Sequence, residues 1–309
     1  MEFAPDPRVD EIDALARTAL PLLERADDHA GLVHVWNAIS ESANHRGRWE
    51  EWGQGREQVV RHARLAGQPT HPLGLGTPYV LGPEPADELL IKLERLPESA
   101  HPGRLLNRAR LLAMLDRFAE AWPLALHGSE RLRELSGDDG GEQYLAAIAT
   151  LEGDHESAAR YLRFYCDRLE TQGYRAFLAT YAPMLGRSLT ALDRYEEAER
   201  CARRGRALGD EKDPSTQALW RQVQALVNAH RGRHTDAERL ARDAVEIMEG
   251  TDSLTYQGDA LWDLADVLTA GGSDEAGAAL TQALDRYERK RNLAMARRVQ
   301  ARLAELQPA

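Results

Sequence analysis

A short signature recurs along the chain at nearly constant spacing, and no other feature restricts the fold as strongly. It consists of a Gly or Asp, usually an Arg, often an aromatic residue, two variable residues and usually an Ala. Its six copies open at Gly47, Asp116, Gly153, Asp193, Gly232 and Gly271. After a first interval of 69 residues, the next four are 37, 40, 39 and 39 residues. Periods of this length indicate a chain that stacks one structural unit repeatedly.

Each copy lies between two stretches with helical periodicity. Leu185 and Leu189 precede Asp193 on one helical face, and Tyr195 and Ala198 follow it on another. The Gly or Asp that opens each copy suits a tight turn between two helices, because both residue types accept unusual backbone angles. Each unit is therefore expected to be a pair of antiparallel helices.

Helix-start signals agree with this pattern. Asp213 offers an N-cap before Pro214 at the first helical position, and the pair Asp252-Ser253 offers another cap. Alternation typical of strands is absent from the sequence. The chain is predicted to be all-α: residues 1–309 form a single tetratricopeptide-like α-α superhelix, or solenoid, of about six to seven helix pairs. A capping helix over residues 292–306 is expected to cover the last apolar face.

One segment interrupts the repeats. Residues 68–85 are rich in Pro and Gly, and we expect no helix between Gln68 and Pro78. The run Gly82-Pro83-Glu84-Pro85 predicts a new helix from about Ala86 to Leu96. This segment is interpreted as a degenerate unit in which an extended stretch replaces the first helix, and as an element that could gate a groove.

Composition excludes several classes of partner. The formal net charge is -11, so the chain lacks the basic footprint that nucleic acid or an anionic membrane requires. No stretch approaches the roughly 18 apolar residues of a spanning helix. The start of the sequence has neither the basic region nor the apolar core of a secretory signal, and only two cysteines are present. We expect a cytoplasmic protein that is a monomer or a homodimer.

No arrangement of residues predicts catalysis, a cofactor or a metal site. His230 and His234 have a metal-capable spacing, but Gly232 places a turn between them. Cys166 and Cys201 lie within helical patterns, where a buried apolar role is usual. The sequence contains neither a Gly-x-Ser-x-Gly nucleophile turn nor a phosphate-binding loop. We predict a protein that is not an enzyme.

The repeat register predicts a set of groove residues. In tetratricopeptide stacks the first helix of each pair lines the concave groove. If the opening residue of each signature is position 15 of a unit, positions 2, 5, 9, 12 and 13 face the groove. Arg would bind carboxylates, and Asn or Gln would pair with an extended backbone. The residues selected in this way are His34, Asn37, Glu41, Arg110, Gln143, Arg187 and Gln222.

The tryptophans of the first helices have two possible roles. Trp36, Trp220 and Trp262 could pack between repeats or form a ligand platform, and core packing is the commoner role at helical spacing. Trp49 and Trp52, one helical turn apart, are expected to pack the first two repeats together.

Several segments resemble the C-terminal tetratricopeptide region of large bacterial signalling ATPases, some of which carry cyclase or transcription-regulator domains. The matching segments are 217–221, 231–233, 237–241, 260–265 and 287–290, with a junction at 81–88. This resemblance implies a sensor or docking arm, with an ATPase or cyclase domain as a possible partner. Neither activity carries over, because the sequence has no cyclase domain and no Gly-x-x-x-x-Gly-Lys-Ser/Thr loop.

Three functions remain open from sequence. The first is a regulatory, protein-interaction scaffold that binds a peptide or a partner domain in its concave groove. The second is a small-molecule sensor, which clustered buried polar groups in a closed pocket would favour. The third is an enzyme on a helical-repeat frame, which paired titratable groups with shifted pKa values would favour.

Overall fold

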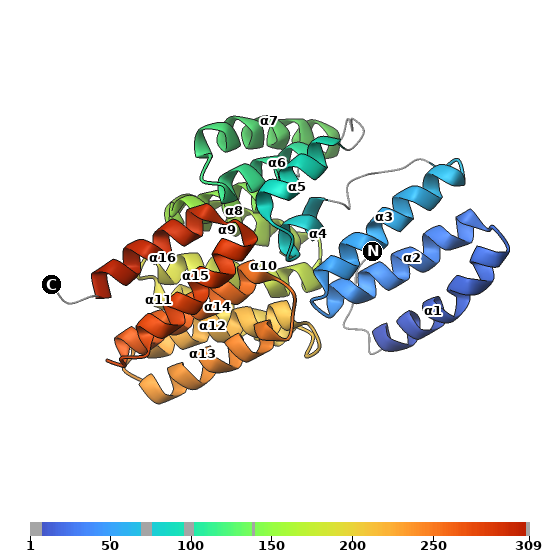
Figure 1. Cartoon of the computed structure of the whole chain (residues 1–309). Coiled ribbons are helices and arrows are strands. Elements are labelled where there is room, and N and C mark those ends of the chain that lie inside the picture. Colours follow the sequence, from blue (N-terminus) through green and yellow to red (C-terminus); the bar gives the residue numbers. More distant parts are fainter. Residues whose placement is uncertain (1–7, 69–75, 96–101, 138–139, 307–309) are drawn as a thin grey trace.

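The computed structural model describes residues 8–68, 76–95, 102–137 and 140–306, and these residues form sixteen helices and no strand (Figure 1). The helices are α1 (Val9–Arg25), α2 (His29–His45), α3 (Trp49–Leu65), α4 (Gly76–Leu81), α5 (Ala86–Arg95), α6 (Gly103–Met114), α7 (Phe118–Ser136), α8 (Glu142–Glu152), α9 (His155–Thr171), α10 (Arg175–Thr190), α11 (Tyr195–Leu208), α12 (Pro214–His230), α13 (His234–Glu249), α14 (Leu254–Ala270), α15 (Ala276–Lys290) and α16 (Leu293–Leu306).

Consecutive helices pack as pairs joined by short turns, and the pairs stack into a superhelix. The regular pairs are α2/α3, α6/α7, α8/α9, α10/α11, α12/α13 and α14/α15, while α4 and α5 form a shorter, irregular pair. The predicted all-α, tetratricopeptide-like superhelix is therefore confirmed.

The turn inside each pair explains the recurring Gly or Asp. The residues that open the first five signatures all have a positive φ, from 58° at Asp193 to 91° at Gly153. A left-handed backbone costs little for Gly and is tolerated by Asp, so these residue types recur. In the last pair the left-handed residue is Gly272, at a φ of 72°, rather than the expected Gly271. The register of the last unit is thus shifted by one residue.

The segment between the first two units contains a helix that the sequence did not predict. Helix α4 begins at Gly76, so Thr77 and Pro78 are helical. Proline is compatible with this position because the first-turn N–H groups of a helix have no intrahelical acceptor. Residues 69–75 of the predicted extended stretch lie outside the described residues. Helix α5 begins at Ala86, where the sequence indicated.

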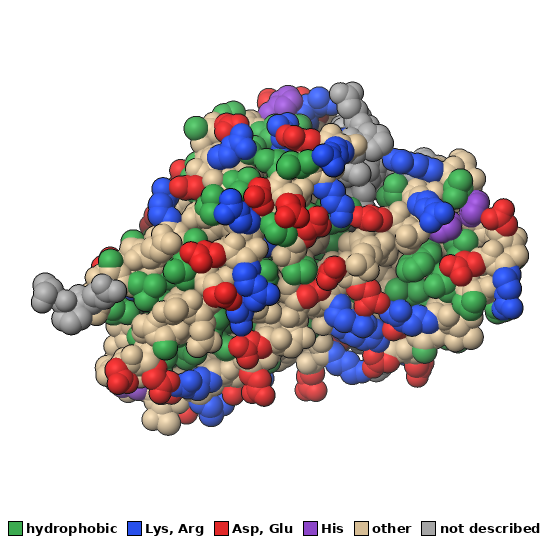
Figure 2. Space-filling view, viewed as in Figure 1, with side chains coloured by type: hydrophobic (Ala, Val, Ile, Leu, Met, Phe, Trp, Pro, Cys, Tyr) green, Lys and Arg blue, Asp and Glu red, His purple; other side chains and the backbone are tan. Residues whose placement is uncertain are grey.

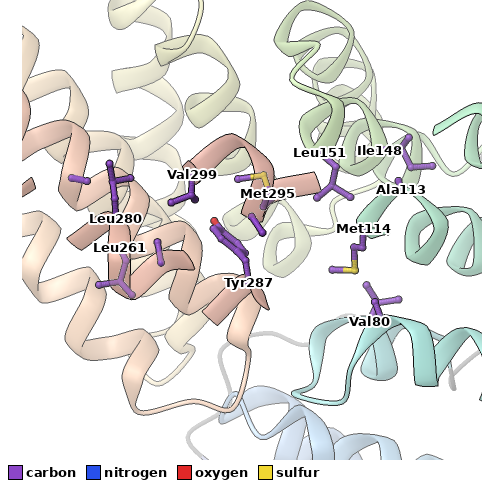
Figure 3. Close-up of a cluster of buried hydrophobic side chains, with 14 of the residues drawn as sticks. Val80, Ala113, Met114, Ile148, Leu151, Leu261, Leu280, Tyr287, Met295 and Val299 are labelled. Carbon is purple, nitrogen blue, oxygen red and sulfur yellow. The ribbon is translucent and has the colours of Figure 1, made fainter. Parts of the chain in front are cut away.

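The superhelix closes on itself, so that its last helices meet helices from the first half of the chain. Helix α16 packs against α15 and also against α6 and α8, and α14 contacts α4. Figure 3 shows Met295 of α16 between Tyr287 of α15 and Leu151 of α8, within one continuous cluster of buried apolar side chains. The C-terminal helix therefore does more than cover an end face, because it joins two distant parts of the stack.

Two polar contacts reinforce this closure, and each caps a helix from far along the chain. The carboxylate of Asp252 accepts hydrogen bonds from the backbone N–H groups of Trp49 and Glu50, both at 2.9 Å, at the start of α3. The ammonium of Lys290 donates to the backbone carbonyls of Tyr79, Gly82 and Glu84, near the C-terminal end of α4. Ser253, in contrast, caps its own helix through the N–H of Tyr256.

Trp49 contributes to the same closure. Its side chain is buried and meets the ring of Tyr256 edge-on at a centroid distance of 5.6 Å. The expectation that Trp49 packs the first two repeats together is therefore incomplete, because its aromatic partner lies on α14.

The surface carries both signs of charge. Figure 2 shows acidic and basic side chains interspersed over the face in view, without an extended area of one sign. None of the described helices is long and apolar enough to cross a membrane.

Candidate functional site

The closed superhelix surrounds a cavity of about 740 Å³. Its walls are α4 and the first helices of the five following pairs, namely α6, α8, α10, α12 and α14. Residues of α9 and α11 also line it, and α16 closes it. Because α16 comes from the far end of the chain, the cavity has walls from both halves of the molecule. A volume of this size lies within the range of small-ligand sites, roughly 300–1,000 Å³.

Helix α14 supplies a wall along most of its length. Tyr256, Asp259, Trp262 and Asp266 follow one another at three or four residues, so they share one face of the helix, and all line the cavity. The lining extends from Thr255 to Ala270, which spans about 22 Å at a rise of about 1.5 Å per residue. The cavity is therefore elongated.

A buried ion-pair cluster joins α10 to α14 across the cavity wall. Arg187 Nε lies 2.8 Å from Asp263 Oδ2, and its Nη1 lies 3.3 Å from Asp259 Oδ2. Burial opposes the charge of Arg187, but the two carboxylates outweigh it and raise the pKa of the guanidinium. Burial raises the pKa of Asp263 to about 6 against the effect of Arg187, so this carboxylate stays ionised at neutral pH.

The two cavity-lining arginines of α16 also have partners. Arg298 donates a 2.9 Å hydrogen bond to the carbonyl of Thr150 and lies 5.5 Å from the ring centroid of Trp262. Arg302 lies 4.0 Å from Asp266, whose carboxylate also accepts a hydrogen bond from the indole of Trp262. These contacts hold α16 against α8 and α14.

The contact between His155 and Arg298 indicates which ring nitrogen of the histidine carries the hydrogen. Its Nε2 lies 3.5 Å from Arg298 Nη2, and since a guanidinium only donates, Nε2 is the acceptor. The ring hydrogen is then on Nδ1, which is buried and has no hydrogen-bond partner among the described residues. Burial, followed by the charges of Arg298 and Arg187, lowers the pKa of His155 to about 4. The imidazole is therefore neutral.

The opposite end of the cavity contains groups without partners. Arg110 of α6 lines the cavity and makes no ion pair or hydrogen bond with any described residue. Gln143 Oε1 and Thr255 Oγ1 also line it, and each is buried without a hydrogen-bond partner in the described part of the chain. Buried polar groups are normally satisfied, so these atoms are unusual in having no hydrogen-bond partner within the described residues.

The predicted groove residues divide into two sets. Arg110, Gln143 and Arg187 line the cavity together. Gln222 is buried, with 2% of the residue exposed, and does not line it.

The α2 residues of the prediction lie outside the cavity. Asn37 accepts a 2.6 Å hydrogen bond from Arg56 of α3, and Glu41 pairs with the same arginine at 3.6 Å. His34 is exposed. The closed superhelix explains this outcome, since its cavity begins at α4 and leaves the first helix pair outside.

The acidic residues of α14 and the basic residues of α16 were not among the predicted groove residues. With Gly272 as the opening residue of the last unit, its five groove positions become Asp259, Trp262, Asp266, Thr269 and Ala270, and all of them line the cavity. The spacing of Asp259, Asp263 and Asp266 was the available signal. Arg298 and Arg302 had none, because they belong to no repeat.

The remaining candidate residues lie in different environments. Trp220 is a buried core residue, whereas Trp262 borders the cavity. His230 stacks on Tyr195 with a centroid distance of 3.7 Å. Burial raises the thiol pKa of Cys166 to about 12 and that of Cys201 to about 11, which disfavours the nucleophilic thiolate.

Comparison with known proteins identifies a shared fold and no sequence family. No family model matches the chain, and no curated protein matches it in sequence. The solved structure of NprR in complex with its cognate peptide NprX aligns over 96% of this chain and 85% of its own, at 14% identity and a TM-score of 0.51. Yeast Tom70 aligns over 96% and 60%, at 12% identity and a TM-score of 0.42. BtubC from P. vanneervenii aligns over 98% and 95%, at 13% identity and a TM-score of 0.31. The similarity to NprR supports the helical-repeat architecture.

Proposed function

We propose that this protein is a non-catalytic regulatory scaffold that binds a short segment of extended peptide in the cavity along α14. The observation that carries the proposal is the shape of the cavity, about 740 Å³ in volume and lined along nearly the whole of α14. A length of about 22 Å accommodates about six residues of extended chain at roughly 3.3 Å per residue. The NprR structure, which contains a cognate peptide, supports a superhelix of this kind as a peptide receptor.

The lining has the chemistry that a peptide backbone requires. After a side-chain rotation toward the cavity, the unpartnered Gln143 Oε1 would accept from a backbone N–H, and the unpartnered His155 Nδ1–H would donate to a backbone carbonyl. Met114, Leu151 and Trp262 supply apolar surface between these groups. A few placed polar groups within an apolar wall are typical of a specific ligand site.

A small-molecule sensor is the second candidate. Enclosure by helices from both halves of the chain, together with the buried cluster of Arg187, Asp259 and Asp263, favours it. An enzyme receives less support, because the shifted pKa values of Arg187 and Asp263 result from burial and from their mutual ion pair.

The signalling context of the proposal rests on the sequence resemblance. We propose that ligand binding is communicated to a partner domain, such as the ATPase or cyclase domain of a bacterial signalling protein, in the cytoplasm. The contacts of α16 with α6 and α8 offer a route, because a ligand in the cavity would touch both ends of the closed superhelix.

A cavity-filling variant tests the proposal. Ala147 lines the cavity, so Ala147→Trp should block it, whereas Ala176 is exposed on α10 and Ala176→Trp is the matched control. Purified wild-type protein and both variants would be incubated with a random hexapeptide pool and with a mixture of small metabolites, and retained molecules identified by mass spectrometry. Peptides retained by wild type and Ala176→Trp but lost from Ala147→Trp support the peptide scaffold. Metabolites with that pattern support the sensor, and equal retention by all three proteins contradicts the cavity as the site.

A further inference from the structure

The charges that line the cavity are balanced except at one end. Arg187 is matched by Asp259 and Asp263, and Arg302 by Asp266. Arg298 is held by the carbonyl of Thr150. Only Arg110, among the lining arginines, has no acidic or carbonyl partner within the described residues.

Two hydroxyl donors line the cavity together with Arg110, and no described carboxylate pairs with this arginine. Tyr181 and Tyr256 line the same cavity, and their hydroxyl groups make no hydrogen bond with the described residues. The charge of Arg110 is close enough to favour ionisation of both phenols, although burial outweighs it and raises both pKa values, that of Tyr256 to about 12. Both hydroxyls therefore keep their hydrogens and remain O–H donors.

A second cation increases the positive field at this end. Burial, and then the charge of Arg110, lowers the pKa of Lys290 to about 7. Lys290 itself is committed to the carbonyls of Tyr79, Gly82 and Glu84, so its ammonium does not serve as a ligand group. When Lys290 is protonated, an anion beside Arg110 would relieve the repulsion between the two positive charges.

These observations identify the chemistry of the missing partner. We infer that the ligand carries a carboxylate, which Arg110 binds at the α4–α6 end of the cavity with Tyr181 and Tyr256 as additional hydrogen-bond donors. This inference rests on the proposed function, because it treats the cavity as the ligand site. An arginine fork matches the two oxygens of a carboxylate and forms stronger bonds with it than with a neutral group. The carboxylate could be the C-terminus of a peptide or an acidic side chain.

Arg110→Gln is the direct test, because it removes the charge and keeps a polar side chain. Arg108→Gln is the matched control: Arg108 lies on the same helix but pairs with Glu94 at 3.0 Å and does not line the cavity. The probes are two N-acetylated random hexapeptide pools that differ only at the C-terminus, one with a free carboxylate and one amidated. Retention by each protein is quantified by mass spectrometry.

We expect wild type and Arg108→Gln to retain the same peptides. Arg110→Gln should retain at least about tenfold less of them, because it loses a charge-assisted hydrogen-bonded pair. Selective retention of the free-acid pool identifies a C-terminal carboxylate. Retention from both pools, with enrichment of Asp or Glu, identifies a side-chain carboxylate. Equal retention by wild type and Arg110→Gln overturns the carboxylate site while leaving the peptide scaffold intact.

A probe that is not a peptide tests the carboxylate site separately from the peptide function. Sodium acetate would be titrated into ¹⁵N-arginine-labelled protein, with sodium chloride as the control, and the Nε–H resonance of Arg110 assigned by its loss in Arg110→Gln. A saturable shift with acetate alone supports the carboxylate site even if no hexapeptide is retained, in which case the peptide function fails. No acetate-specific shift, combined with no retained peptide, overturns both.

Discussion

Lys290 Nζ donates a 2.6 Å hydrogen bond to the backbone carbonyl of Gly82, 208 residues earlier in the chain. The same ammonium bonds the carbonyls of Tyr79 and Glu84, at 3.1 and 2.7 Å. It thereby satisfies carbonyl groups at and beyond the end of α4, a helix too short to be stable alone.

Replacing this lysine should therefore loosen the closure of the superhelix. Lys290→Met leaves three buried carbonyls without their donor, and we expect a loss of about 2–4 kcal/mol in the free energy of unfolding. Urea denaturation followed by circular dichroism measures it. Arg289→Met, at an exposed neighbouring position, is the control and should cost less than about 0.5 kcal/mol. Equal stability of the two variants would contradict the proposed role of Lys290.

Asp252 should act mainly on a helix to which it does not belong. Asp252→Ala removes the acceptor of the Trp49 and Glu50 N–H groups and should cost about 1–2 kcal/mol, as for other lost N-caps. Hydrogen exchange should show faster exchange of these two amides. Ser253→Ala, which removes the cap of α14, should leave exchange at Trp49 unchanged. Increased exchange at the start of α14 alone in Asp252→Ala would argue against the long-range cap.

The ion pair between Arg187 and Asp263 should be non-additive. Arg187→Met leaves a buried carboxylate unpaired and should cost about 3–5 kcal/mol. The double variant Arg187→Met/Asp263→Leu should recover part of this loss, because the uncompensated charge is also removed. A double-mutant cycle based on urea midpoints provides the coupling energy. Strictly additive losses would show that the two residues stabilise the fold independently.

His155 should make the protein sensitive to mild acid. Its folded-state pKa of about 4 lies below the ordinary histidine value of 6.5, so the unfolded chain takes up the proton first as the pH falls. The stability contributed by the neutral imidazole is present above pH 6.5 and is lost as the pH falls toward 4. We expect a loss of about 1–2 kcal/mol, reduced for partial exposure. His155→Gln should have a flatter stability profile between pH 7 and pH 4.5, and identical profiles would disprove the assignment.

Much of the fold was accessible from local sequence signals. The turn residues Gly153 and Asp193 could be recognised because a left-handed backbone restricts the residue type. The same turns set the repeat register, which correctly placed Arg110, Gln143 and Arg187 at the cavity. Such signals act within one unit, where a few residues determine the geometry.

The remaining features depend on contacts between distant parts of the chain. The choice between Gly271 and Gly272 is a matter of one residue, yet it moved the acidic face of α14 out of the predicted groove. The exclusion of α2 from the cavity and the entry of Arg298 follow from closure, which no repeat period encodes. Closure depends on side chains such as Lys290, whose acceptors lie in an irregular segment.

The contact of α16 with α6 and α8 also restricts how such a chain can evolve. In an open stack, units can be duplicated or deleted, because each unit needs only its neighbours. Here an added pair would displace α16 from α6, and a deleted pair would remove one wall of the chamber. Substitutions can diversify the units, but the number of units is set by the contact that closes the superhelix between α16 and α6.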